Sequence, residues 1–352
     1  MAAGVANRPV FEPIGNGQWA RLDWAHRTEL GSSGRIGLVG WRTGAVLALR
    51  LWSPAPRLSL DSCFCLFHVS IMAIDPMSES GSAPVFAISQ VCSLHSPLET
   101  DLENFAAANC QYMEAWFTKL ESYLESHSEQ QLKELLVKHG ITIPVASFQG
   151  GLLASQGEAR QVSWDQFRAR LDLCRQLGIQ TVVVAADVMD PLDEKTVQRV
   201  RFSARELASE AKGRGLRVAL EFQARATFIN NLQTCLAIVE EVASPHLGVC
   251  LDAFHFHVGC SKHQDLRQLS RETLFHVHLC DVANAPREFA ADADRILPGD
   301  GDMDVSLLYQ SCLEIGYQGC ISLELLNPTI WQVLSRQVAE VGMNALNRLN
   351  GR

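Results

Sequence analysis

Residues 247–281 read LGVCLDAFHFHVGCSKHQDLRQLSRETLFHVHLCD, and this stretch decides the fold. It begins and ends with a short apolar run that becomes polar where it stops, at Asp252 and at Asp281. Apolar runs of this length predict strands that are buried on both faces. Parallel α/β proteins carry their chemistry on polar residues at the carboxyl ends of such strands. We therefore expect a parallel α/β fold with a functional site at these strand ends.

The same alternation of strand and helix patterns extends over residues 84–352. We count eight strand–helix units, and glycine marks four helix-to-strand junctions, at Gly140, Gly178, Gly215 and Gly316. Ser96 and the pattern Ser163-Trp164-Asp165-Gln166 are typical of helix starts, and the last helix is predicted from Trp331 to Leu349. Eight units of this size are typical of a (β/α)8 TIM barrel, which needs about 250 residues. A doubly wound open sheet is the structural alternative. No GxGxxG sequence follows the first predicted strand, so the nucleotide-binding form of that sheet has no support.

Residues 1–83 show no helical or strand periodicity of useful length. Glycine- and serine-rich segments within them are typical of flexible chain. We expect either an unstructured extension or a start codon assigned too early, with Met72 or Met77 as the true start. The predicted domain organisation is thus an extension over residues 1–83 and a barrel over residues 84–352.

Charge and cysteine usage limit the class of protein. The net charge of −9 argues against nucleic-acid binding, which normally needs a basic face. The 11 cysteines are scattered, as expected for buried, reduced thiols in a cytosolic protein rather than a disulfide framework. No stretch is long and apolar enough to span a membrane. We expect a cytoplasmic protein whose partner is a small molecule, not nucleic acid or a membrane.

Four successive predicted strands end in residue types that bind metals. The fifth ends at Glu221, the sixth at Asp252, the seventh carries His276 and His278, and the eighth ends at Glu324. Each residue alone is more simply explained as a salt-bridge partner or a hydrogen-bonded core residue, but four together favour one shared site. Charged groups in apolar runs are costly to bury unless they are paired or bound to metal. A ligand set rich in oxygen is typical of sites for Mn²⁺, Mg²⁺ or Co²⁺, whereas many zinc sites are rich in sulfur. We therefore expect one of these three metals, with Zn²⁺ as an alternative. His276 lies deeper in its strand and is expected to support the site rather than bind the metal.

The segment 217–331 resembles the xylose-isomerase-like TIM-barrel superfamily, in its sugar phosphate isomerase/epimerase branch. The matching pieces are Leu220-Glu221, Leu251-Asp252-Ala253-Phe254-His255, His276-Val277-His278-Leu279-Cys280-Asp281, Asp294-Arg295-Ile296-Leu297-Pro298-Gly299-Asp300-Gly301, and Ile315-Gly316-Tyr317 leading into Ser322-Leu323-Glu324-Leu325-Leu326-Asn327-Pro328. The resemblance implies that one divalent metal ion is held by Glu221, Asp252, His278 and Glu324. It also implies that His255 and Arg295 contact the substrate.

The reaction that this set favours is proton transfer next to a carbonyl. A divalent metal lowers the pKa of the neighbouring C–H and stabilises an enediolate. Glu221 and Glu324 are the expected catalytic residues, one removing and one returning the proton, so that a sugar or sugar phosphate is isomerised or epimerised. Trp116 and Gln149, at the ends of the second and third strands, are further expected substrate contacts. Trp116 and Phe148 form either an apolar wall of the site or simply part of the core.

Three other functions use the same parts. A metal-dependent dehydratase of an inosose or dehydroshikimate-type ketone would expel a β-hydroxyl instead of returning the proton. A barrel that binds a sugar without catalysis would need no metal. Apurinic endonucleases of the superfamily hold three zinc ions with extra histidines. Here the second and third strands end without histidine, and the segment Asp294-Arg295-Ile296 contains none, which argues against a site for three metal ions. The resemblance also makes a homo-oligomer an expectation.

Overall fold

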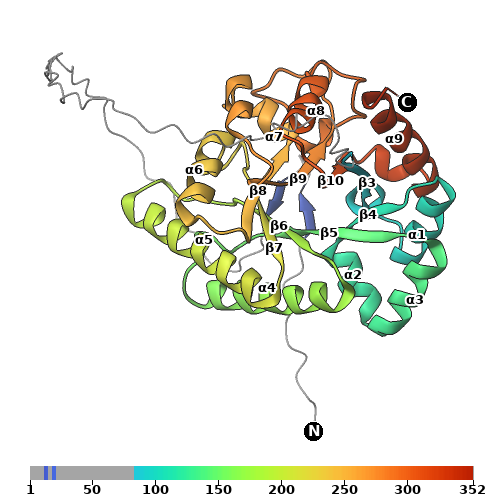
Figure 1. Cartoon of the computed structure of the whole chain (residues 1–352), viewed down its shortest axis with the longest axis horizontal. Helices are drawn as coiled ribbons and strands as arrows, with labels where there is room; N and C mark the ends of the chain where they lie inside the picture. Colours follow the sequence, from blue (N-terminus) through green and yellow to red (C-terminus); the bar gives the residue numbers. More distant parts are fainter. Residues whose placement is uncertain (1–11, 15–17, 21–82, 352) are drawn as a thin grey trace, which may run out of the picture. The chain divides into compact units, whose positions relative to one another are not determined.

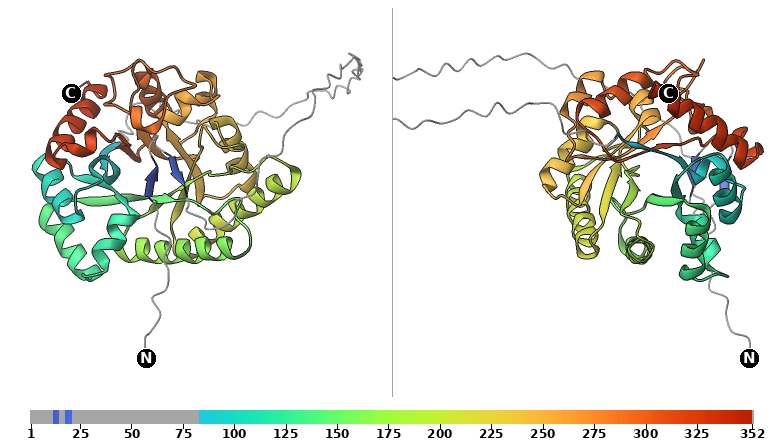
Figure 2. Two further views of the ribbon diagram at one scale, coloured as in Figure 1. Left: turned by 180° about the vertical axis from the view of Figure 1, so that it is seen from behind. Right: turned by 45° about the vertical axis from the view of Figure 1, so that its right-hand side comes forward.

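The computed structural model describes residues 12–14, 18–20 and 83–351. Within them, eight parallel strands form a closed barrel in the order β10-β3-β4-β5-β6-β7-β8-β9 (Figures 1 and 2). These strands are β3 (Val85–Ser89), β4 (Tyr112–Trp116), β5 (Thr142–Gln149), β6 (Thr181–Ala185), β7 (Arg217–Glu221), β8 (Leu247–Asp252), β9 (Leu274–Leu279) and β10 (Cys320–Leu323). The predicted TIM barrel is confirmed, and the open sheet is excluded because β10 pairs with β3.

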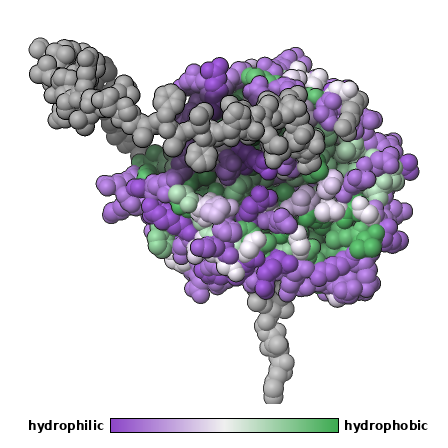
Figure 3. All heavy atoms as spheres, viewed as in Figure 1, coloured by the Kyte–Doolittle hydropathy of each residue, from purple (hydrophilic) through white to green (hydrophobic). Residues whose placement is uncertain are grey.

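Helices alternate with the strands and surround the barrel (Figure 1). Those of residues 83–351 are α1 (Leu98–Ala107), α2 (Phe117–Leu124), α3 (Glu129–His139), α4 (Gly157–Leu177), α5 (Glu194–Arg214), α6 (Leu232–Val242), α7 (Ala253–Val258), α8 (Val305–Glu314) and α9 (Ser335–Leu349). On the face shown in Figure 3, hydrophilic residues cover much of these helices, with smaller hydrophobic areas between them.

Several predicted helix starts are wrong. α4 begins at Gly157, so Ser163 lies inside the helix instead of capping it. The Ser96 hydroxyl donates to the carbonyl oxygen of Pro97 (3.5 Å) and makes no cap of α1. α9 begins at Ser335, because Trp331 belongs to a separate 3₁₀ turn and its indole N–H donates to the Val91 carbonyl (2.8 Å). α2 was not predicted, since β4 runs directly into it without a turn residue.

The helix-to-strand junctions follow the sequence closely. Gly140, Gly178, Gly215 and Gly316 have φ angles of 64°, 78°, 70° and 69°. Only glycine adopts this left-handed backbone without a steric cost, and it commonly ends a helix. The four junctions therefore end their helices where the sequence predicts.

The inside of the barrel is packed in layers. A small apolar cluster contains strand residues only, and it lies apart from the larger core between strands and helices. Its buried members are Ala87, Val145, Val183, Ala219, Cys250, Phe275 and Cys320. A Cβ added to Gly248 would lie 2.5 Å from the ring of Phe275, so the glycine makes room for that ring. This layer fills the barrel below the strand ends, where the polar residues gather.

The predicted extension over residues 1–83 falls largely outside the described residues, and so do Met72 and Met77. Of it, β1 (Glu12–Ile14) and β2 (Gln18–Ala20) are described and pair antiparallel. The nine cysteines of the described barrel are all unpaired, and all but Cys260 are buried, as predicted. None of the described helices has both the length and the apolar character needed to cross a membrane.

Candidate active site

Four predicted residues converge at the carboxyl ends of neighbouring strands. Glu221 ends β7, Asp252 ends β8, His278 lies in β9, and Glu324 follows β10. One potential ligand atom from each lies within 4.8 Å of the others. We call these four residues the acidic centre. The strand register explains their approach, because Asp252 and Ser322 both pair with His278 across the sheet.

His278 stands in the middle of the acidic centre. Its Nδ1 lies 2.8 Å from Oε1 of Glu221, 3.4 Å from Oε2 of Glu324 and 3.6 Å from Oδ2 of Asp252. The side chain is only 1% exposed, so these contacts form away from bulk water. Three carboxylates thus face one imidazole nitrogen.

Arg295 closes the acidic centre from one side. Its Nη1 donates to Oδ2 of Asp252 (2.8 Å) and to Oε2 of Glu324 (2.9 Å). Its other nitrogens donate to Oδ1 of Asp292, and its guanidinium lies 4.6 Å from the centroid of the Phe254 ring. The side chain is 1% exposed. The residue predicted to contact substrate is therefore also a counter-charge for two residues of the acidic centre.

The loop that carries Arg295 is fastened by the buried carboxylate of Asp281. This carboxylate accepts backbone N–H groups from Val282 (2.8 Å), Gly299 (3.0 Å), Gly301 (3.1 Å) and Met303 (2.9 Å). The backbone of Asp281 also forms an antiparallel bridge with Ile296, next to Arg295. A Cβ on Gly301 would lie 2.3 Å from Oδ1 of Asp281, so glycine is required there. The polar residue that ends the opening stretch thus acts by positioning a loop.

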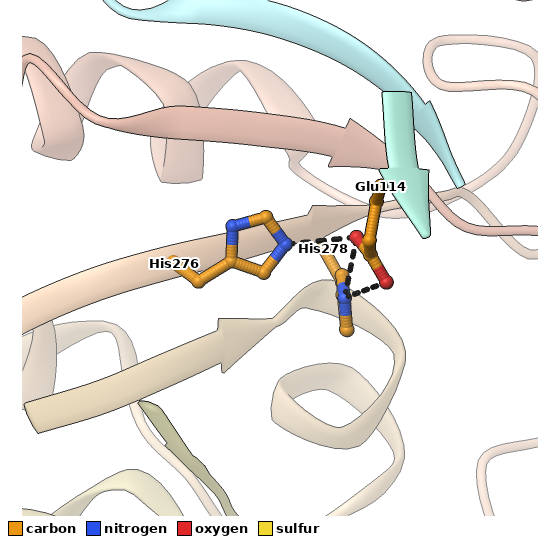
Figure 4. Close-up of side chains that lie close together, drawn as sticks. All are labelled: Glu114, His276 and His278. Atoms are coloured by element: carbon orange, nitrogen blue, oxygen red, sulfur yellow. Dashed lines mark hydrogen bonds and ion pairs between the residues drawn. The ribbon is translucent and has the colours of Figure 1, made fainter. Parts of the chain in front are cut away.

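Glu114 of β4 contacts the acidic centre through His278 and was not predicted from the sequence (Figure 4). Its Oε2 lies 2.9 Å from Nε2 of His276 and 3.1 Å from Nε2 of His278, and its Oε1 accepts from the Ser89 hydroxyl (3.2 Å). Glu114 and both histidines are fully or almost fully buried. Because Glu114 occupies one ring nitrogen of His278, the other, Nδ1, faces the three carboxylates. A charge between the apolar residues Met113 and Ala115 was the available signal.

The electrostatics of the acidic centre fit a divalent cation. Burial alone would raise the pKa of Asp252, but the positive charge of Arg295, together with the hydrogen bond to His278, holds it well below its ordinary value. Burial raises the pKa of Glu324 well above its ordinary value, although His278 and Arg295 oppose the shift. The neighbouring charges of Glu221 and Asp252 also raise it, so Glu324 resists ionisation unless further positive charge lies nearby. Three carboxylates and one imidazole nitrogen are a donor set that a divalent cation would satisfy.

The remaining predicted residues lie around this group in different ways. His255 follows Asp252 in α7, and Oδ1 of Asp252 accepts its backbone N–H (2.8 Å). Trp116 ends β4 and packs edge-on against Phe148, with ring centroids 5.1 Å apart. Gln149 is used within the protein: its side-chain oxygen accepts from Arg170 (3.0 Å), and its side-chain nitrogen donates to the carbonyl of Gly150 (2.8 Å). The structure therefore does not bring Gln149 into the acidic centre.

Known proteins share this architecture. The chain is 28% identical to an inosose isomerase of Bacillus velezensis over 249 residues, which are 69% of this chain and 88% of that protein. It is 29% identical to a 3-dehydroshikimate dehydratase of Pseudomonas putida over 266 residues, which are 72% of this chain and 40% of that protein. The crystal structure of the IolI protein with a binding zinc atom matches with a TM-score of 0.70 and 25% identity, over 75% of this chain and 97% of that one.

A family model gives the same result over most of the barrel. The model of the xylose isomerase-like TIM barrel matches residues 102–349, which include every residue of the acidic centre. The closed eight-stranded barrel agrees with this match. The chain therefore belongs to the xylose isomerase-like TIM-barrel family.

Proposed function

We propose that the protein is a divalent-metal-dependent isomerase or epimerase of a small sugar or polyol ketone. The observation that carries this proposal is the convergence of Glu221 and Glu324 on His278. Their strands, β7 and β10, are separated in the barrel by β8 and β9. The two carboxylates therefore approach the acidic centre from opposite sides, as a transfer of a proton between two positions requires.

The four residues of the acidic centre would hold the cation. When bound, a divalent metal there supplies a Lewis acid that stabilises negative charge on the oxygen next to the reacting carbon. Glu114 keeps Nδ1 of His278 directed at the carboxylates, as a carboxylate behind a metal-binding histidine does. The zinc atom in the crystal structure of IolI supports the assignment of a metal site to the same fold.

The protein residues would move the proton. One of the two glutamates takes it from the carbon next to the carbonyl, and it returns to the opposite face of that carbon or to the neighbouring carbon. The first outcome is epimerisation and the second is isomerisation. Each glutamate is held in position by a neighbour, since Gln223 donates to Oε2 of Glu221 (2.5 Å) and Arg295 donates to Oε2 of Glu324 (2.9 Å). Fixed carboxylates lose little freedom on reaching the transition state.

A dehydratase is the second candidate, favoured by the 29% identity with the 3-dehydroshikimate dehydratase. It would begin with the same removal of a proton. The steps then differ, because a hydroxyl leaves from the β-carbon as water and the product gains a carbon–carbon double bond. Isomerisation leaves the molecular formula unchanged, so the product distinguishes the two reactions.

The test compares wild type with the double variant Glu221→Gln/Glu324→Gln, and uses the exposed Glu288→Gln as a control for the loss of a carboxylate. We expect about one divalent metal ion per chain by elemental analysis in wild type and control, and little in the double variant. Wild type in D₂O should exchange a C–H of an inosose for C–D without loss of water from the substrate. Water loss from the substrate would support the dehydratase, and absence of metal after loading with Mn²⁺, Co²⁺ or Zn²⁺ would refute both.

A further inference from the structure

Two buried nitrogens near the strand ends have no hydrogen-bond partner among the described residues. They are Nε1 of Trp116 and Nδ1 of His255, in side chains that are 9% and 6% exposed as whole residues. Buried tryptophan N–H groups usually have a partner, so an exception calls for an explanation. A third such atom, Nδ1 of His276, lies deeper, in the ring whose Nε2 contacts Glu114. The first two are therefore the ones placed to meet a ligand at the barrel mouth.

Trp116 and His255 lie on opposite sides of the barrel. β4 and β8 are four strands apart in either direction around the closed sheet (Figure 1). Trp116 is two residues beyond Glu114 in β4, so both side chains point to the same face of the strand, the barrel interior. His255 follows the last residue of β8 by three positions. A molecule bound above the acidic centre would thus meet one of these nitrogens on each side.

Trp116 is held in place by contacts that leave its indole N–H unused. Its backbone N–H donates to Oε1 of Gln90 (3.1 Å), whose Nε2 donates to the buried Asp101 (3.1 Å). Its ring packs against Phe148, which has a φ of 81° and whose carbonyl accepts from Arg170 (2.8 Å). The protein therefore fixes the position of this donor before any ligand arrives.

From this geometry we infer that Trp116 determines substrate specificity through its indole N–H. This inference rests on the proposed function and adds a substrate class to it. The indole N–H is a donor only, so its partner must be an oxygen that accepts. The substrate is a polyol ketone with a hydroxyl oxygen on a carbon remote from the carbonyl: the carbonyl end lies at the acidic centre, and the remote oxygen accepts from Nε1 of Trp116 across the mouth.

The experiment compares Trp116→Phe with Trp164→Phe in the full chain. Phenylalanine keeps an aromatic ring against Phe148 but removes the unused donor together with part of the indole ring, and Trp164→Phe matches this loss of ring. Trp164 is the matched control, because it is a buried indole whose N–H already donates within the protein, to the Leu152 carbonyl (3.2 Å). The probe is scyllo-inosose, with Zn²⁺-loaded protein labelled with ¹⁵N at the indole nitrogens. The readouts are the Nε1–H resonances, the KM and kcat for C–H exchange, and the melting temperature.

The resonance that is missing from the spectrum of Trp116→Phe is assigned to the Nε1–H of Trp116. In wild type, we expect this resonance to shift when the probe saturates the site, whereas the resonance of Trp164 should not shift. Trp116→Phe should raise KM about three- to tenfold, the effect of one lost hydrogen bond, and should lower the melting temperature less than Trp164→Phe does, because it breaks no hydrogen bond within the protein. Trp164→Phe should lower the melting temperature and leave KM unchanged. If wild type exchanges the probe but its Trp116 resonance and the KM of Trp116→Phe do not change, this inference alone is overturned. If wild type neither binds nor exchanges any polyol ketone, the proposed function fails and this inference fails with it.

Discussion

Replacement of Glu114 should weaken metal binding although Glu114 is not one of the four residues of the acidic centre. The Glu114 carboxylate accepts hydrogen bonds from the Ser89 hydroxyl and from Nε2 of both His276 and His278. Burial alone would raise its pKa, but the charge of His278 and the bonds from the two histidines hold that pKa well below its ordinary value. We therefore expect an ionised carboxylate that orients the His278 ring and strengthens Nδ1 as a ligand.

Two variants separate the orientation of His278 from the charge of Glu114. Glu114→Gln keeps one acceptor oxygen for the histidines and can donate its new N–H to Ser89, so mainly the charge is lost. Glu114→Leu removes the acceptor and leaves two buried histidine N–H groups unpaired, each costing about 1–3 kcal/mol of unfolding free energy. Loss of a supporting carboxylate typically weakens metal affinity about 10- to 100-fold. We expect Glu114→Gln near the lower end of this range and Glu114→Leu near the upper end.

The assay is a calorimetric titration of metal-free protein with Zn²⁺, together with thermal unfolding of the same metal-free samples. Glu288→Gln serves again as the control for the loss of a carboxylate, because Glu288 is exposed. Glu114→Leu should melt at a lower temperature than wild type, whereas Glu114→Gln should melt close to it. A Glu114→Leu protein that folds and binds Zn²⁺ as tightly as wild type would refute the role given to Glu114.

Asp281→Ala should lower kcat/KM at least about tenfold, because the loop that carries Arg295 loses four backbone hydrogen bonds to the Asp281 carboxylate. The metal content should stay unchanged, and an unaltered kcat/KM would contradict this role of Asp281. Gly248→Ala should lower the urea midpoint of unfolding, because its new Cβ would overpack against Phe275 and cost about 1–3 kcal/mol of unfolding free energy. Gly213→Ala is the control: nothing lies within 4 Å of its new Cβ, so it should raise the midpoint slightly. Burial raises the pKa of Asp187, so its ionised form costs stability above its ordinary pKa of about 3.9, and the cost disappears as the pH falls below that value. Asp187→Asn should therefore melt higher than wild type at pH 7 and like wild type near pH 3, and melting curves that differ equally at both pH values would exclude this explanation.

Much of the barrel could be predicted because its signals are local. The strands appear as short apolar runs, and glycines mark four helix ends where the backbone adopts a positive φ. Helix starts were less predictable: the Ser163 motif resembles a cap but lies inside α4, since the actual start at Gly157 carries no comparable signal. α2 was missed because no turn residue separates it from β4.

The sequence by itself determined which strand ends carry ligand-type side chains. Glu221, Asp252, His278 and Glu324 could be identified because a charge that interrupts an apolar run is visible within a few residues. Closure of a parallel barrel then requires their strand ends to meet at one mouth. The structure brings their potential ligand atoms within 4.8 Å of one another.

Only the tertiary structure decided which residues surround the acidic centre. Glu114 reaches His278 over 164 positions of sequence, because β4 and β9 lie across the barrel interior from each other. Closure of the sheet, and the way side chains fill the space inside it, decides the other long-range contacts as well. These are the two histidine contacts of Glu114, the two carboxylate contacts of Arg295 and the hydrogen bond between Gln149 and Arg170. Such contacts join residues far apart in sequence, so no local periodicity encodes them.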